Sequence, residues 1–327
     1  YSDKEDIPCN LLKPDITIIY GKYENNENWK QFLNICDIIT YEFESFDINL
    51  LKSVENKVYP KIDKLEIIQD KLKQKQYLEF NNLSVGPFKE IKTTNDIHEF
   101  IKKYNYPIMI KSRRGSFDGR GNKLIQNIDE LNNWLLNNKE IIQQYYLESF
   151  IKFQYEMSIC GCLDKNKNLF YYEPVINTHK NNILLNTTYS KNIKLKLKCK
   201  IIKLYKQLLK LFDTKGVICV EFFITNDNVY VNEIALRVHN SYHISLDCCN
   251  LSQFDMHIRS IMGLKVMKPK FICNGIMYNI ISNMQQLNDI LKIINNQVDR
   301  NCRFVIKDYH KKPNKIRKIG HINVKLS

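Results

Sequence analysis

The chain has 327 residues and a formal net charge of +14 at pH 7, and 44% of its residues are hydrophobic. This length exceeds the usual size of one domain, so we expect two or three lobes around a sizeable core. There is no run of about 18 consecutive apolar residues, and the first residues lack the pattern of a signal peptide. We therefore expect no membrane span and no secretion, and we predict a cytoplasmic protein.

The excess of Lys and Arg raises the possibility of nucleic-acid binding, because clustered basic residues bind phosphate backbones. Here the basic residues are spread along the chain, with local density only at 191–200 and 309–318, and no nucleic-acid-binding module accompanies them. We interpret most of this charge as solvated surface and expect no nucleic-acid partner. Ten cysteines lack a CxxC pair or zinc spacing, which predicts reduced thiols, no disulfides and no zinc site.

The N-terminal part alternates apolar and amphipathic segments. Strand-like runs occur at 15–20 and 37–40, a helix-like segment lies between them at 28–36, and a further mixed segment covers 47–56. This βα alternation favours a parallel sheet. A helix is predicted over 69–82.

The remaining elements follow from periodicity and turn residues. Up to residue 138 we predict a strand near 87–92, a helix at 95–104, a strand at 106–111 and a helix at 128–138. Strands at 140–148, 155–163 and 169–176 and a helix at 192–212 come next. The last elements are strands at 217–224 and 229–236, a helix at 252–263, and short strands from 270 onward with one helix near 285–294.

Two carboxylates stand out in the predicted hairpin. A three-residue loop at 226–228 would place Thr225 opposite Val229 and Glu221 opposite Glu233. Carboxylates facing each other at about 5 Å repel unless a cation lies between them. Mg²⁺ takes such carboxylates together with phosphate oxygens, and Asn232 could add an oxygen ligand. Two solvent-facing glutamates paired with surface lysines explain the hairpin about as well.

A glycine-rich loop at 115–121 follows the strand that ends at Lys111. Glycines let backbone amides approach a phosphate, and Arg113, Arg114 and Arg120 supply positive charge. A plain turn explains this loop alone about as well, and no GxxxxGK[ST] motif is present. Together with Lys111 and the two glutamates, the loop favours a site for the phosphates of ATP.

This combination resembles the ATP-grasp superfamily and, within it, the N5-carboxyaminoimidazole ribonucleotide synthetase family. The matching segments keep the family's order and cover nearly the whole chain: TYEFE (40–44), IIQDKLKQK (67–75), IKSRRGSFDGRGN (110–122), LESFIKFQYEMS (147–158), EPVINTH (173–179), VEFFITNDNVYVNEIALRVHNSYH (220–243), LSQFDMHIRSI (251–261) and RKIGHINV (317–324). The glycine-loop wording also resembles the synthetase part of bifunctional phosphoribosylaminoimidazole carboxylase.

The resemblance implies an α/β (α+β) ATP-grasp fold in three parts. Residues 1–75 would form a truncated N-terminal Rossmann-like βα domain, 76–262 the ATP-grasp domain, and 263–327 a small C-terminal β-rich lobe. ATP would lie between two sheets. The implied reaction is ATP-dependent carboxylation of 5-aminoimidazole ribonucleotide with bicarbonate, through carboxyphosphate, in purine biosynthesis.

The resemblance also implies a role for individual residues, with ATP and Mg²⁺ as cofactors. Arg237, His239 and Asp118 would be catalytic, and Glu221 and Glu233 would bind the metal. The implied ATP-binding residues are Lys71, Lys111, Ser116, Phe117, Asp118, Gly119, Arg120, Gly121, Asn122, Glu148, Ser149, Phe150, Ile151, Glu156, His179, Asn232 and Glu233. The implied substrate-binding residues are Arg237, His239, Asn240, Ser241, Lys311, Arg317 and Lys318.

The sequence departs from the family at three places. The family opens with a strand and a glycine-rich loop that do not precede residue 15 here. We therefore expect that the sequence is a fragment, that its N-terminal domain is reduced, or that the gene model omits the first strand and helix. HNSGH reads HNSYH, and the resulting Tyr242 either narrows the pocket or points away from it. Asn314 stands where an arginine is usual.

Partners and rival functions follow from the same comparison. The resemblance implies a homodimer and a carboxymutase, either as a separate protein or as a fused domain. Another purine ATP-grasp ligase and, from a different class, a basic non-catalytic binding protein are the alternatives.

Overall fold

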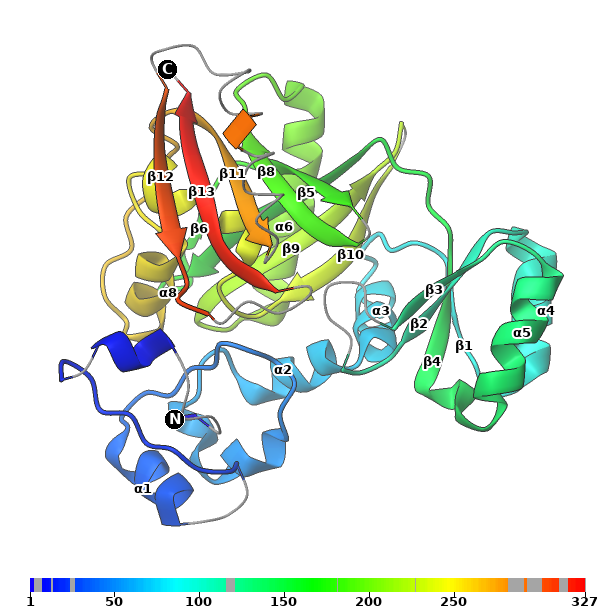
Figure 1. Cartoon of the computed structure of the whole chain (residues 1–327), viewed down its shortest axis with the longest axis horizontal. Coiled ribbons are helices and arrows are strands. Elements are labelled where there is room, and N and C mark those ends of the chain that lie inside the picture. Colours follow the sequence, from blue (N-terminus) through cyan, green and yellow to red (C-terminus); the bar gives the residue numbers. More distant parts are fainter. Residues whose placement is uncertain are drawn as a thin grey trace.

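The computed structural model describes residues 1–2, 8–12, 14–23, 27–115, 121–180, 182–226, 228–281, 291–292, 302–311 and 317–326. Two sheets organise this part of the chain. One has the strand order β1-β4-β2-β3, and the other has the order β10-β9-β5-β7-β8-β11-β13-β12 with β6 paired to β5. Figure 1 shows the smaller sheet, with α4 and α5 beside it, projecting from the larger one.

The N-terminal segment is mostly helical. Its elements are η1 (Pro8–Leu12), α1 (Glu27–Ile35), η2 (Ile48–Lys57), α2 (Ile62–Gln69) and α3 (Lys71–Phe80). The predicted strands at 15–20 and 37–40 are wrong, because these runs form only the isolated parallel bridges Ser2↔Tyr20 and Ile39↔Val58. Ile39 and Val58 instead pack with Trp29 in a small separate core. The predicted helices at 28–36 and 69–82 are confirmed within two residues at each end.

The smaller sheet and its helices come next in the chain. They are β1 (Phe88–Glu90), α4 (Thr94–Tyr104), β2 (Ile108–Ser112), β3 (Asn122–Ile125), α5 (Ile128–Asn138), η3 (Lys139–Gln144) and β4 (Tyr145–Ser149). A capping box between Thr93 and Asp96 starts α4, whose Ile97 and Phe100 pack against the sheet. The strand predicted over 140–148 is wrong in its first half, because η3 continues from α5.

The larger sheet and its helices complete the described chain. They are β5 (Tyr155–Leu163), β6 (Leu169–Tyr171), β7 (Val175–Lys180), β8 (Ile183–Tyr189), α6 (Leu195–Phe212), β9 (Gly216–Ile224), β10 (Val229–Ala235), η4 (Asn240–Tyr242), α7 (Ser245–Cys248), α8 (Gln253–Ile261), β11 (Asn274–Ile281), β12 (Arg303–Asp308) and β13 (Lys318–Leu326). The run predicted as one strand at 169–176 is split before β7, where Pro174 has no N–H for a ladder. Strand β8 was not predicted from the sequence. The helix predicted near 285–294 lies largely outside the described residues.

The two faces of this sheet have different neighbours. Apolar side chains of α6, among them Tyr205, Leu208 and Phe212, pack on Val220 and Phe222 of β9. Side chains that alternate with these along the strands point to the opposite face. That face carries a second apolar cluster and, beside it, the polar residues of the candidate site.

The hairpin of β9 and β10 contains a β-bulge that the sequence prediction missed. Val229 pairs with Ile224 and not with Thr225, and the register then shifts between Val231 and Glu233. The shift places Glu233 opposite Glu221. The predicted pairing of the two glutamates is therefore confirmed, although the loop and register proposed for it are wrong.

Candidate functional site

A cavity of about 1200 Å³ is lined by residues of both sheets and of the N-terminal segment. Ligand pockets commonly measure about 300–1,000 Å³, so this one has room for a nucleotide and a second small molecule. The predicted site residues in its wall are Lys71, Lys111, Asn122, Glu148, Ser149, Phe150, Ile151, Glu156, His179, Glu221, Asn232, Glu233, Arg237, His239, Asn240, Lys311, Arg317 and Lys318.

A few predicted site residues do not line this cavity. Ser116, Phe117, Asp118, Gly119 and Arg120 lie outside the described residues, as does Asn314. Gly121 directly precedes β3 and has a positive φ of 83°, a conformation that glycine adopts without strain. Ser241 is fully buried behind the cavity wall.

Two lysines neutralise one buried carboxylate at the smaller sheet. Lys111 Nζ lies 2.6 Å from Glu148 Oε2, and Lys75 Nζ lies 3.3 Å from Glu148 Oε1. Lys75 also donates a hydrogen bond to the backbone oxygen of Val231 (3.0 Å), and the hydroxyl of Tyr146 donates to Glu148 (2.8 Å). Burial opposes ionisation of Glu148, but Lys111 and Lys75 outweigh it and lower its pKa to about 2. The carboxylate is therefore ionised at neutral pH.

Lys75 is a site residue that the sequence analysis missed. It follows Lys71 by four residues on α3, so the two side chains lie on the same face of the helix, and both line the cavity. This spacing could have identified it. Burial lowers the pKa of Lys75, and Glu148 opposes that effect.

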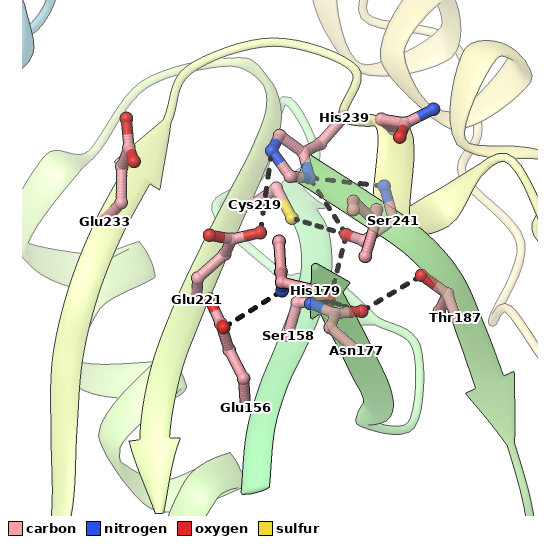
Figure 2. Close-up of polar contacts among 12 residues, drawn as sticks. Glu156, Ser158, Asn177, His179, Thr187, Cys219, Glu221, Glu233, His239 and Ser241 are labelled. Atoms are coloured by element: carbon pink, nitrogen blue, oxygen red, sulfur yellow. Dashed lines mark hydrogen bonds and ion pairs between the residues drawn. The ribbon is translucent and has the colours of Figure 1, made fainter. Parts of the chain in front are cut away.

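The two paired glutamates have different surroundings. Glu233 Oε1 lies 3.4 Å from Lys71 Nζ, whereas Glu221 Oε1 lies 3.8 Å from His239 Nε2. Figure 2 shows Glu221 directed toward His239 and Glu233 apart from it on the neighbouring strand. Burial raises the pKa of Glu221 to about 7, with His239 acting in the opposite direction. A buried carboxylate that is only partly compensated by its neighbours fits a cation site.

A second grouping around Glu221 was not predicted. Atoms of Glu156, His179 and Glu221 lie within 4.8 Å of one another, close enough to share one ion, and His179 Nδ1 is 3.0 Å from Glu156 Oε2 (Figure 2). Glu233 does not belong to this group. Among the described residues, Glu221 therefore has Glu233, the other predicted metal ligand, opposite it on β10. Glu156 and His179, which are expected to contact the nucleotide, are its other neighbours.

Arg237 is held by a carboxylate from the N-terminal segment. Its Nε atom lies 3.6 Å from Glu44 Oε2, and Glu44 Oε1 accepts a hydrogen bond from the backbone N–H of Leu236 (2.7 Å). Burial raises the pKa of Glu44, while Arg237 opposes this rise. The sequence analysis quoted the segment that contains Glu44 without giving it a role.

His239 is oriented by a chain of polar side chains from η4 and three strands (Figure 2). Its Nδ1 lies 2.9 Å from Ser241 Oγ, which accepts a hydrogen bond from Ser158 Oγ at 2.9 Å. Asn177 donates to Ser158 (3.1 Å) and accepts from Thr187 (3.0 Å). These bonds leave Nε2 of His239 turned toward Glu221.

Tyr242 points away from the cavity. It is fully buried, and its hydroxyl donates to the backbone oxygens of Ser158 (3.1 Å) and Glu173 (2.9 Å). Its ring packs against Tyr172 with centroids 5.2 Å apart. Of the two alternatives for this residue, the structure supports the one in which the pocket is not narrowed.

Comparison with known proteins identifies the family. Residues 76–254 match the ATP-grasp domain model. An N5-carboxyaminoimidazole ribonucleotide synthase from Staphylococcus aureus is 31% identical over an alignment of length 335, gaps included. The alignment covers 98% of this chain and 84% of that protein. The chain belongs to the N5-carboxyaminoimidazole ribonucleotide synthase family. It is therefore an ATP-dependent ligase, and the predicted ATP-grasp fold of mixed helices and strands is confirmed.

Solved structures of the synthase family have the same fold as this chain. The Aspergillus clavatus synthase complexed with ATP has a TM-score of 0.87 and 27% identity, covering 99% of this chain and 86% of that one. The structure from the same organism with ADP and 5-aminoimidazole ribonucleotide has a TM-score of 0.86 and 26% identity, with the same coverage. No described helix is both long and apolar enough to cross a membrane.

Proposed function

We propose that this synthase carboxylates 5-aminoimidazole ribonucleotide with bicarbonate, consuming ATP and producing the N5-carboxy compound, ADP and phosphate. One observation carries the proposal. One cavity wall holds lysines and the segment 148–151, which suit a nucleotide. The same wall holds cationic residues that suit a second anionic substrate, namely Arg237, Lys311, Arg317 and Lys318. The names of the relatives, and the ligands of the Aspergillus structures, support the same assignment.

The nucleotide roles are assigned as follows. Lys71 and Lys111 hold phosphates, and the segment from Glu148 to Ile151 contacts adenine where β4 leaves the smaller sheet. Glu156 accepts hydrogen bonds from the ribose hydroxyls, with His179 beside it. Phe150 is half-exposed in the present structure, which leaves its ring available to a ligand.

A magnesium ion fits beside Glu221 and Glu233, because hard cations prefer carboxylate oxygens together with phosphate oxygens. Asn232 is the bulge residue that directly precedes Glu233, and it lines the same cavity. When bound, the ion neutralises phosphate charge during transfer. Glu156 and His179 lie near enough to Glu221 to orient it.

The reaction divides into two displacements. A bicarbonate oxygen attacks the γ-phosphorus of ATP, ADP leaves, and carboxyphosphate forms. The amine of 5-aminoimidazole ribonucleotide then attacks the carboxyl carbon, phosphate leaves, and the amine loses a proton.

Arg237 and His239 hold bicarbonate for both displacements. Burial opposes protonation of His239, but Cys219 and Glu221 raise its pKa to about 9, which favours a positively charged ring. Electrostatic stabilisation of this kind, with water excluded, is what a carboxyphosphate intermediate requires. The family resemblance assigns Asp118 to the amine of the ribonucleotide. Asp118 lies outside the described residues.

The wider setting of the enzyme belongs to the same proposal. The chain acts in the cytoplasm as a homodimer, and a carboxymutase, separate or fused, consumes its product. The division into domains at 1–75, 76–262 and 263–327 also stays a prediction.

The experiment is a measurement of phosphate release from ATP with magnesium and bicarbonate at fixed ionic strength, with and without 5-aminoimidazole ribonucleotide. Stimulation by the ribonucleotide supports the proposal. Stimulation by glycinamide ribonucleotide and formate in its place would assign the chain to another purine ligase. Salt-sensitive binding to nucleic acid without nucleotide-dependent turnover would favour the basic binding protein.

A further inference from the structure

Two cysteines face each other across neighbouring strands behind the cavity. Cys160 of β5 is the register partner of Cys219 of β9. Both side chains belong to the same apolar cluster and are at most 1% exposed.

Backbone geometry brings the two sulfurs together. The carbonyl oxygen of Cys160 accepts a hydrogen bond from the N–H of Tyr172 (2.9 Å), so the backbone groups of Cys160 point toward β6 and away from β9. The pair with Cys219 is therefore of the type without ladder hydrogen bonds, in which opposite Cα atoms lie about 4.5 Å apart. This separation falls within the range of about 4.4–6.8 Å found across disulfides.

Cys219 also connects this pair to the site. It lines the cavity, and its sulfur lies 3.7 Å from Ser241 Oγ, the atom that holds Nδ1 of His239. Figure 2 shows the sulfur beside Ser241 and below His239. A small oxidant in the cavity therefore meets Cys219 first, with Cys160 directly behind it.

We propose that Cys160 and Cys219 are a modification site, at which a hydroperoxide forms a reversible cross-strand disulfide. The Cys219 sulfur attacks the peroxide oxygen, giving a sulfenic acid and, from hydrogen peroxide, one water. The Cys160 sulfur then displaces the sulfenic oxygen as a second water. Two thiols lose two electrons and two protons, and hydrogen peroxide is reduced to two waters.

The disulfide changes the wall of the site. Bonding draws the Cys219 sulfur toward Cys160 and away from Ser241, because a disulfide bond is only about 2.05 Å long. Ser241 then loses its contact with the Cys219 sulfur, while it still holds Nδ1 of His239. A displacement of about 1 Å in a positioned group can lower turnover about 100-fold, which is the loss expected for the oxidised fraction.

The test is peptide mass spectrometry without reduction, after treatment of the full chain with hydrogen peroxide and alkylation of the remaining thiols. We expect the peptides of Cys160 and Cys219 to be linked with the loss of two hydrogen atoms. Cys160→Ala should abolish this link. Cys162→Ala is the matched control, because Cys162 is equally buried on the same strand but faces Val217, and it should leave the link intact.

Activity provides the second measurement, and this part rests on the proposed function. Peroxide should lower turnover in step with the link, and dithiothreitol should restore both in the wild type. No link, or a link confined to Cys248 and Cys273 of the same apolar cluster, would overturn the proposal. Since the link is detected by mass, a chain that failed to use 5-aminoimidazole ribonucleotide would still report on the cysteine pair.

Discussion

Glu148 contacts two lysines although one would neutralise it. Lys111 and Lys75 leave the group with a net positive charge in the cavity wall. The surplus suits an anionic ligand such as a triphosphate, because opposite charge nearby compensates for the loss of water. Lys75 is 3% exposed and therefore cannot recover its hydration without unfolding.

Replacing Lys75 tests this arrangement. Lys75→Met should destabilise the fold by about 3–5 kcal/mol, the usual effect of removing one partner of a buried ion pair, and should weaken ATP binding. Thermal denaturation and nucleotide titration measure the two effects. Lys73→Met is the control. Within the described part of the chain, the ion-pair partner of Lys73 is the exposed Glu66, and Lys73 does not line the cavity. Equal effects of the two substitutions would contradict the role given to Lys75.

Acid should reveal the ionisation of Glu148. Its pKa is about 2 in the folded chain against an ordinary value of 4.5, so its contribution to stability is fully present above 4.5 and is lost as the pH falls toward 2. The difference in unfolding free energy between wild type and Glu148→Gln should therefore shrink over this interval. Denaturant titrations at a series of pH values measure it, and a constant difference would be inconsistent with an ionised Glu148.

Glu233 tests the metal assignment. Glu233→Gln keeps the size of the side chain and removes the charge that would bind magnesium, so turnover should fall at least about 100-fold while the fold persists. Glu66→Gln removes a carboxylate from the exposed surface and should leave turnover unchanged. Phosphate release and circular dichroism report the two properties, and full activity of Glu233→Gln would refute the assignment.

At the scale of elements, the β-bulge explains why the hairpin prediction succeeded for its glutamates and failed for its register. Regular alternation would place Val231 and Glu233 on one face, yet Val231 is in the core under α6 and Glu233 lines the cavity. The bulge at Asn232 resolves this conflict by turning Asn232 and Glu233 toward the same side. It also leaves the Val231 carbonyl within reach of Lys75.

Removing the bulge tests separately its effect on the position of Glu233 and its effect on the Val231 carbonyl. Deletion of Asn232 should keep Glu233 opposite Glu221, since the register shift disappears with the extra residue, so the chain should still fold. The changed path of Val231 takes the acceptor away from Lys75, and ATP affinity should fall about tenfold. Asn232→Ala keeps the bulge and should have a smaller effect. Isothermal titration with ATP distinguishes them, and equal affinities for the two variants would mean that the bulge itself does not matter.

The sequence predicted the helices well, because a helix forms its hydrogen bonds between residues that are close together in the chain. The helices α3, α4, α5 and α6 have the apolar periodicity and end signals of amphipathic helices, and they were found close to their true bounds. The N-terminal runs at 15–20 and 37–40 have strand-like composition, but a strand exists only when a neighbour supplies hydrogen bonds. The ion pairs of Lys75 and Glu44 could not be predicted from local patterns either, because their partners Glu148 and Arg237 lie 73 and 193 residues away along the chain.

At the scale of the whole molecule, the cavity depends on how the two sheets are joined. Residues 150–154 connect β4 of the smaller sheet to β5 of the larger one, and Phe150 and Ile151 of this connection line the cavity. Lys75 adds a second link, because it contacts both Glu148 in the smaller sheet and Val231 in the larger one. A ligand that touches both walls should therefore stabilise the molecule as one unit.

Magnesium and ATP together should raise the melting temperature more than ATP with a chelator. A ligand at about 100 times its dissociation constant stabilises the native state by about 2.7 kcal/mol, and carboxylates of the larger sheet that bind the metal would strengthen binding of MgATP. Differential scanning fluorimetry with MgATP, ATP plus EDTA, and duplex DNA at low salt gives the comparison. The Glu233→Gln variant, which keeps Glu221, should gain less from magnesium than the wild type. Stabilisation by DNA and not by MgATP would mean that the +14 charge, and not the cavity, determines what this chain binds.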